Sequence, residues 1–89
     1  MFDQDVYEAL EMEFERKHIG EDVEEVLLDL AEALEERGIM DKEINLTESY
    51  GKTQVKVYGV CSEEDGEVNV LIKRIQIGKK EFEIEDYFL

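Results

Sequence analysis

The spacing of apolar residues changes once along this chain, near Gly38, and this change constrains the fold more than any other feature. Before Gly38 the apolar residues recur about every 3.6 residues, which is typical of helices that bury one face. After Gly38 apolar and polar residues alternate, which is typical of strands with one buried face. The sequence therefore predicts helices followed by strands.

The first predicted helix runs from about residue 3 to about residue 17, and Asp3 or Asp5 lies near its N-cap. Gly20 permits the left-handed turn that commonly ends a helix. The core stripe of this first helix consists of apolar residues four apart, Phe2, Val6, Leu10 and Phe14. Glu13 falls inside this stripe, so we expect either that the helix end lifts off the core or that Glu13 reaches water around its edge.

The second predicted helix runs from Asp22 to about residue 37. Asp22 and Glu25 resemble a capping box, and Gly38 is placed for the C-terminal cap. One face of this helix is apolar and consists of Val23, Val26, Leu27, Leu30 and Leu34.

Turn signals divide the second part of the chain into strands. They lie at residues 50–52, at Asp65-Gly66 and at residues 78–80. Within the third strand the apolar set shifts from Val68, Val70 and Ile72 to Leu71, Ile75 and Ile77, which predicts a bulge near Lys73-Arg74. The chain has no proline or linker, so residues 1–89 form one predicted α+β domain. Its expected layout is ααββββ, with two N-terminal helices packed on one face of a three- or four-stranded antiparallel β-meander.

Charge limits the partners of this domain. The chain has 25 acidic and 10 basic residues, a net charge of -15, whereas a magnitude of roughly 2 to 8 suffices for solubility. Residues 1–38 hold 14 acids and 3 bases, so the helical part carries most of this charge. The charge opposes direct binding to nucleic acid or to an anionic membrane, and it favours a basic partner. A single cysteine, Cys61, and the absence of an apolar run long enough for export or membrane insertion predict a cytoplasmic location.

The candidate partner-binding residues lie on the outer faces of the two helices. On the second helix a column of carboxylates falls on one side, with Leu28 beside it as a potential apolar anchor: Glu21, Glu25, Asp29, Glu32 and Glu36. A second cluster on the first helix consists of Glu8, Glu11 and Glu15. A solvated surface is the competing interpretation, because charge runs usually are only that. Like charges four residues apart destabilise a helix, and this cost favours a functional reason for the column.

Catalytic chemistry has little support in the sequence. His18 is the sole histidine, Cys61 lies in a predicted strand, and the acidic run at residues 63–67 lacks the ligand spacing of an EF-hand. We therefore expect no enzymatic activity, no catalytic residue, no metal site and no cofactor; a carboxylate-based metal enzyme is the third hypothesis. Six bases fall in the strand region without aromatic interleaving, a weak signal for nucleic-acid binding: Lys52, Lys56, Lys73, Arg74, Lys79 and Lys80.

In size and charge the chain resembles the small acidic proteins that imitate nucleic acid, such as the anti-restriction and anti-CRISPR inhibitors of phages. The resemblance implies a non-enzymatic inhibitor from a phage or mobile element that blocks a basic nucleic-acid-binding enzyme through its acidic helix faces. The alternative is a structural or regulatory subunit that assembles through its sheet edge or its apolar C-terminus, residues 86–89. Homo-oligomerisation stays open under both hypotheses.

Overall fold

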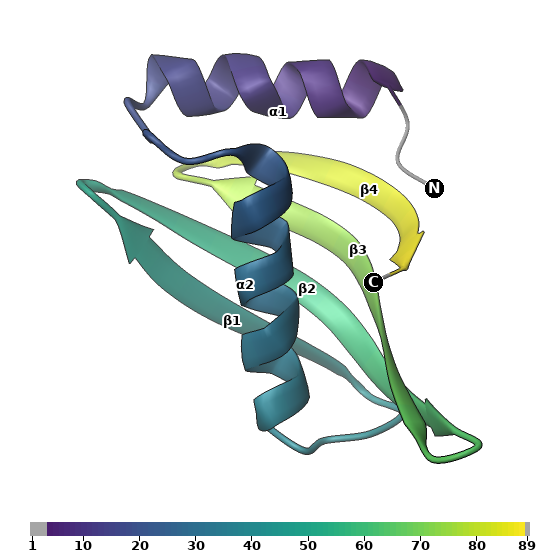
Figure 1. Cartoon of the computed structure of the whole chain (residues 1–89). Helices are drawn as coiled ribbons and strands as arrows, with labels where there is room; N and C mark the ends of the chain where they lie inside the picture. The colour runs from purple at the N-terminus through teal and green to yellow at the C-terminus, as the bar shows by residue number, and fades with distance from the viewer. Residues whose placement is uncertain (1–3, 89) are drawn as a thin grey trace.

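The computed structural model describes residues 4–88 and the side chains of residues 4–84. It confirms the predicted ααββββ layout: two helices precede one four-stranded antiparallel sheet in the order β1-β2-β3-β4 (Figure 1). The predicted contributions of Phe2, Asp3 and the C-terminal side chains lie outside the described residues. The elements are α1 (Gln4–Arg16), α2 (Val23–Glu36), β1 (Glu43–Tyr50), β2 (Thr53–Glu64), β3 (Glu67–Ile77) and β4 (Lys80–Phe88).

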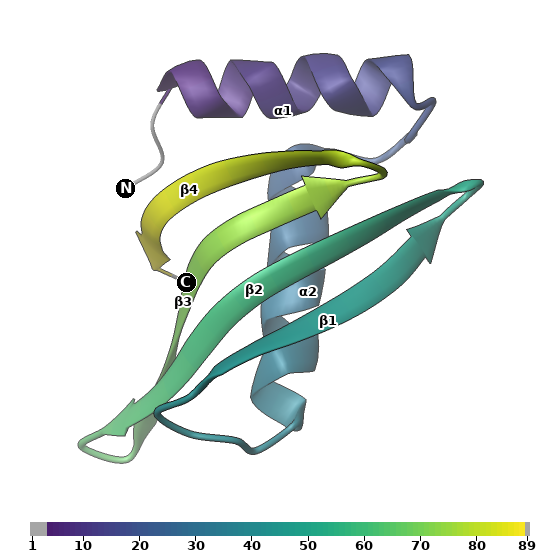
Figure 2. The same ribbon diagram turned by 180° about the vertical axis from the view of Figure 1, so that it is seen from behind.

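The two helices cover different parts of the sheet. Helix α2 crosses the face formed by β1, β2 and β3, whereas α1 lies along β4 and passes the N-terminal end of α2 (Figure 1). Within residues 4–88, no helix lies over the opposite face of the sheet (Figure 2). Neither of these helices is long and apolar enough to cross a membrane, as far as the described residues extend.

Helix α1 ends in a Schellman motif, and His18 rather than Gly20 adopts the left-handed conformation, with φ 58. The amide of Ile19 donates to the carbonyl of Phe14, and the amide of His18 donates to the carbonyl of Glu15. This arrangement turns Ile19 into the core, where it is 8% exposed. The prediction that Gly20 ends this helix is therefore wrong, because burying Ile19 requires the turn two residues earlier.

Helix α2 begins and ends where the sequence predicts. The carboxylate of Asp22 accepts a hydrogen bond of 3.3 Å from the amide of Glu24, which caps the N-terminus. At the other end Gly38 has φ 69 and donates to the carbonyl of Glu35. The predicted apolar face of α2 is buried along its whole length. This face supplies much of the core above the sheet.

The predicted hairpins and the bulge are present in the sheet. Asp65 and Gly66 both have positive φ, 52 and 81, as the tight turn between β2 and β3 requires. Lys73 is the extra residue of the bulge, because Tyr58 pairs with Arg74 whereas Gly59 pairs with Ile72. On β3 the buried residues are Val70, Ile72, Ile75 and Ile77. Leu71, which pairs with Val60, is only half-buried. The prediction that Leu71 belongs to the inward set of β3 is therefore wrong.

Glu13 is buried in the core stripe of α1, and neither predicted arrangement is correct. Its side chain is 4% exposed, yet its carboxylate lies 3.4 Å from Arg16 Nη1 and 3.9 Å from Lys80 Nζ. Lys80 is the first residue of β4, so a tertiary ion pair joins α1 to the sheet. Two nearby cations compensate for the desolvation of this carboxylate, and the helix therefore need not lift off the core.

Candidate functional site

All nine predicted partner-binding residues are exposed on the two helices and the loop between them. They are Glu8, Glu11 and Glu15 on α1, Glu21 in the loop, and Glu25, Leu28, Asp29, Glu32 and Glu36 on α2. Leu28 is 47% exposed, although its neighbours Leu27 and Leu30 are fully buried. The carboxylates of α2 therefore lie on the side that faces away from the core, as predicted.

The chain places its ion pairs elsewhere. Within residues 4–84, arginine and lysine form ion pairs with Glu13, Glu43 and Glu81, and none of these acids belongs to the predicted binding set. Within the described residues, therefore, no lysine or arginine of the chain forms an ion pair with the carboxylates of the acidic helix faces. Such a surface has a negative potential that an external cation can neutralise.

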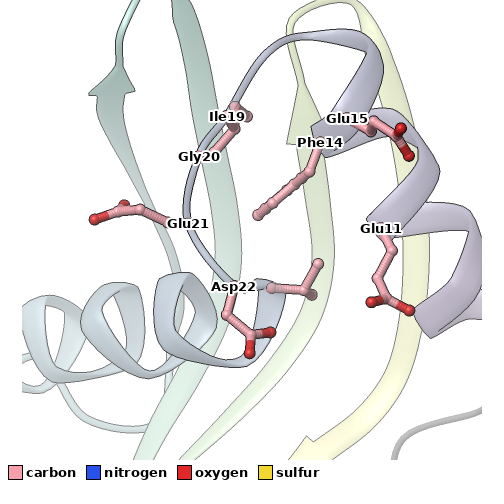
Figure 3. A pocket seen from close by; sticks show the side chains of 8 residues that line it. Glu11, Phe14, Glu15, Ile19, Gly20, Glu21 and Asp22 are labelled. Atoms are coloured by element: carbon pink, nitrogen blue, oxygen red, sulfur yellow. The ribbon is translucent and has the colours of Figure 1, made fainter.

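The two acidic faces do not form one continuous column, because α1 and α2 point in different directions (Figure 1). They meet at the corner where the helices are joined. A hollow of about 440 Å³ lies there, and Figure 3 shows the side chains around it. Its lining consists of Glu11, Phe14, Glu15, Ile19, Gly20, Glu21, Asp22 and Val23. The structure thus brings three predicted residues, Glu11, Glu15 and Glu21, to one place.

A second hollow, of about 480 Å³, lies on the other side of the same loop. It extends to the turn between β1 and β2 and is lined by His18, Ile19, Gly20, Glu21, Ser49, Tyr50 and Gly51. The two hollows share residues 19–21, which form the ridge between them. Sequence analysis did not find Tyr50 as a site residue, because only the tertiary fold places this turn beside the loop between the helices.

Tyr50 lies in a negative environment. Partial burial raises the pKa of its hydroxyl, and the nearby carboxylates of Glu21 and Asp29 raise this pKa further. Glu48 on the same strand acts in the same direction. The phenol of Tyr50 therefore stays protonated, as a hydrogen-bond donor beside the acidic column of α2.

The open face of the sheet contains an aromatic and cationic cluster that sequence analysis did not predict. Arg74 lies over the ring of Tyr58 at 4.1 Å from its centroid, and Lys56 lies at 5.1 Å. Arg74 also pairs with Glu81 at 3.2 Å and with Glu43 at 3.7 Å. Strand pairing places Arg74 opposite Tyr58, so the aromatic interleaving depends on the register. Acids and the ring of Tyr58 therefore already engage Arg74, and the same ring engages Lys56.

The structure places Cys61 in the core and His18 at the surface. No group of three or more histidine, cysteine, aspartate or glutamate side chains is arranged to hold a metal ion within the described residues. Cys61 is buried and free; burial raises the pKa of its thiol and Glu35 raises it further, which disfavours the reactive thiolate. His18 is exposed at the end of α1 and lines the second hollow.

Comparisons with family profiles, with curated proteins and with solved structures give no match to this chain.

Proposed function

We propose that this chain is a non-enzymatic binding protein whose acidic helix faces occupy the basic surface of a nucleic-acid-binding protein and block it. The observation that carries the proposal is the distribution of charge. Eight carboxylates on α1, α2 and the loop between them are exposed without an intramolecular cation within the described residues, while the ion pairs form at Glu13, Glu43 and Glu81. A basic partner is the ligand that such a surface attracts most strongly.

The cost of the acidic column supports the same proposal. On α2, Glu25 and Asp29 are four residues apart, Asp29 and Glu32 are three apart, and Glu32 and Glu36 are four apart. Each such pair of like charges destabilises a helix by about 0.2–0.5 kcal/mol. The column therefore costs roughly 1 kcal/mol in total, and a cationic partner removes this repulsion when it binds.

The spacing of the column suits a protein groove that normally holds a nucleic-acid strand. Residues four apart on a helix are separated by about 6 Å along its axis. On one nucleic-acid strand, the direct distance between neighbouring phosphates is about 6 to 7 Å, although the rise along the duplex axis is only about 3.4 Å per phosphate. Lysine and arginine side chains arranged for successive phosphates would therefore meet successive carboxylates of α2, with Leu28 as an apolar contact beside them.

The first test is affinity capture from a cell lysate at low salt, with elution by a salt gradient and identification of bound proteins. A captured nucleic-acid-binding enzyme is then purified, and its nucleic-acid binding is measured with increasing amounts of this chain. The decisive variant changes Glu25, Asp29 and Glu32 to lysine. A matched control changes Glu63, Glu64 and Glu67 to lysine, because these exposed residues lie at the β2–β3 hairpin and alter the net charge equally.

We expect the helix variant to lose inhibition and the hairpin variant to keep most of it. If both variants inhibit like the original chain, the acidic face of α2 is a solvated surface and the proposal is wrong. If both lose inhibition equally, net charge alone acts and the α2 face has no specific role.

Assembly through the sheet edge receives less support. Strand β1 is an edge strand, and its exposed Glu43 and Glu48 are the kind of charged residues that discourage pairing with another strand. A second copy of a chain with net charge -15 would add long-range repulsion. We therefore retain the acidic helix faces as the functional surface.

A further inference from the structure

The two hollows beside the loop between α1 and α2 share residues 19–21 as lining, and together they are here called the corner groove. It runs from Glu11 and Glu15 on α1, over residues 19–21, to Ser49 and Tyr50 at the β1–β2 turn. The volumes of its two parts are about 440 and 480 Å³. The corner groove is concave, whereas the carboxylate column of α2 lies on a convex helix surface. The two surfaces therefore suit differently shaped parts of a partner.

The groove combines an apolar base with an acidic rim. Phe14 and Ile19 line it and are 3% and 8% exposed, so they form its base rather than its edge. Glu11, Glu15 and Glu21 are exposed; in Figure 3 the first two extend from α1, and Glu21 extends from the loop on the opposite side. Lysine and arginine side chains have the complementary structure, an apolar stem that ends in a charged group.

Two features of the groove determine where a cation would bind. Asp22 is already occupied, because it caps the amide of Glu24 and accepts a hydrogen bond of 3.3 Å from the hydroxyl of Tyr7. The N-terminus of α2 carries a partial positive charge, which disfavours a cation next to Asp22. Glu11 and Glu15 lie on α1, whose C-terminal end has the opposite partial charge. A cation is therefore most favourable along the α1 wall, at Glu11 and Glu15, and less favourable beside Glu21, which directly precedes the N-cap of α2.

Gly20 leaves the middle of the groove open. A Cβ atom added at Gly20 would have no atom within 4 Å, and the backbone of Gly20 is not in the left-handed region. The surface of the ridge between the two hollows is therefore unobstructed at Gly20. A metal ion is a poor occupant, because the described acids do not converge as a ligand cluster. A segment with several cations along its length matches carboxylates that are spread over two hollows.

We infer that the corner groove binds an extended, arginine- or lysine-bearing segment that projects from the partner protein, with side-chain stems on Ile19 and Phe14 and charged ends at Glu11, Glu15 and Glu21. This inference rests on the proposed function and adds a second point of contact to it. The α2 column meets the basic groove of the partner, and the corner groove holds a loop or tail beside that groove. Tyr50 donates a hydrogen bond to the backbone of this segment at the far end of the groove.

The test uses a fluorescein-labelled octa-arginine peptide and fluorescence anisotropy, together with amide chemical-shift mapping of the labelled protein. The first variant, Gly20→Leu, adds an aliphatic side chain to the middle of the groove from a position with open space around it. The second combines Glu15→Gln with Glu21→Gln and removes two charges from the rim. Its matched control combines Glu63→Gln with Glu64→Gln and removes two exposed charges at the β2–β3 hairpin. Circular dichroism and thermal unfolding confirm the fold of each variant.

We expect Gly20→Leu and the rim variant each to weaken peptide binding by about tenfold, and the hairpin control to weaken it by less than about threefold. Shift changes on peptide addition should concentrate at residues 19–21 and 49–51. If rim and hairpin variants have equal effects, or if shift changes avoid both segments, the inference is wrong. That result leaves the α2 face untouched, because the lysine substitutions on α2 and inhibition of the captured enzyme decide the proposed function separately.

Discussion

Replacing Gly59 by alanine should destabilise the protein, although alanine is the smallest possible addition. The added Cβ would lie 2.9 Å from the carbonyl oxygen of Leu71 and 3.0 Å from Cδ1 of Leu34. Leu34 can rotate away, but the oxygen of Leu71 belongs to the backbone of the paired strand β3 and cannot move without disturbing the sheet. Forcing an extra methyl group into a close-packed interior costs about 1–3 kcal/mol.

A matched control is Gly20→Ala, where the new Cβ meets no atom within 4 Å. Both substitutions reduce the freedom of the unfolded chain by a similar amount, which stabilises a protein by about 0.4–1 kcal/mol where the native backbone permits the new residue. The difference between the two variants therefore isolates the native-state clash. We expect the Gly59 variant to be less stable than the Gly20 variant by about 1–3 kcal/mol. Each kcal/mol of this difference corresponds to a Tm lower by roughly 4–8 °C for a domain of this size.

The assay is urea unfolding followed by circular dichroism, with thermal unfolding as a second measurement. Equal slopes of free energy against urea concentration would show that both variants expose the same surface on unfolding. If the Gly59 variant proved as stable as the Gly20 variant, the close approach of α2, β2 and β3 at Gly59 would be wrong.

Four further substitutions or measurements examine single features of the structure. Asp29→Lys should raise the free energy of unfolding by roughly 1 kcal/mol, because it converts repulsion with Glu25 and Glu32 into attraction. The same variant should weaken partner binding. Lower stability in urea would contradict the calculated cost of the column. His18→Gly should stabilise the protein by about 0.5–1 kcal/mol in thermal unfolding, because His18 has φ 58 and glycine adopts this conformation without strain; a destabilised variant would mean that the His18 side chain contributes more than its backbone costs. The pKa of Tyr50 is raised above 10.0 in the folded state, so its contribution to stability is complete below that pH and is lost as the pH rises through the raised pKa. Tyr50→Phe should therefore reduce the fall in the free energy of unfolding at alkaline pH. An unchanged pH profile of this free energy would contradict the raised pKa of Tyr50. Cys61 should react with iodoacetamide at least about tenfold more slowly in the native protein than in urea, because burial and a raised pKa both protect the thiol; equal rates would place Cys61 at the surface.

Local sequence determined the elements of this fold, because each element depends on contacts within a few residues. The spacing of Val23, Val26, Leu27, Leu30 and Leu34 specifies one buried helix face, and these residues are buried. Asp22 and Gly38 cap that helix through their own side chain and backbone conformation. Asp65-Gly66 forms its turn for the same local reason. The exposure of the α2 carboxylates also follows from the spacing, since a helix with one buried face turns the opposite face outward.

Only the tertiary structure decided features that depend on what a second element supplies. Glu13 is buried beside Arg16 on its own helix, but its second cation, Lys80, is distant in sequence and reaches it only in the folded chain. His18 rather than Gly20 ends α1, because Ile19 must reach a core that the other elements complete. The register of β2 and β3 places Arg74 over Tyr58. The corner groove exists because the fold places the end of α1, the start of α2 and the β1–β2 turn side by side. No local pattern in the sequence predicts that these three segments meet.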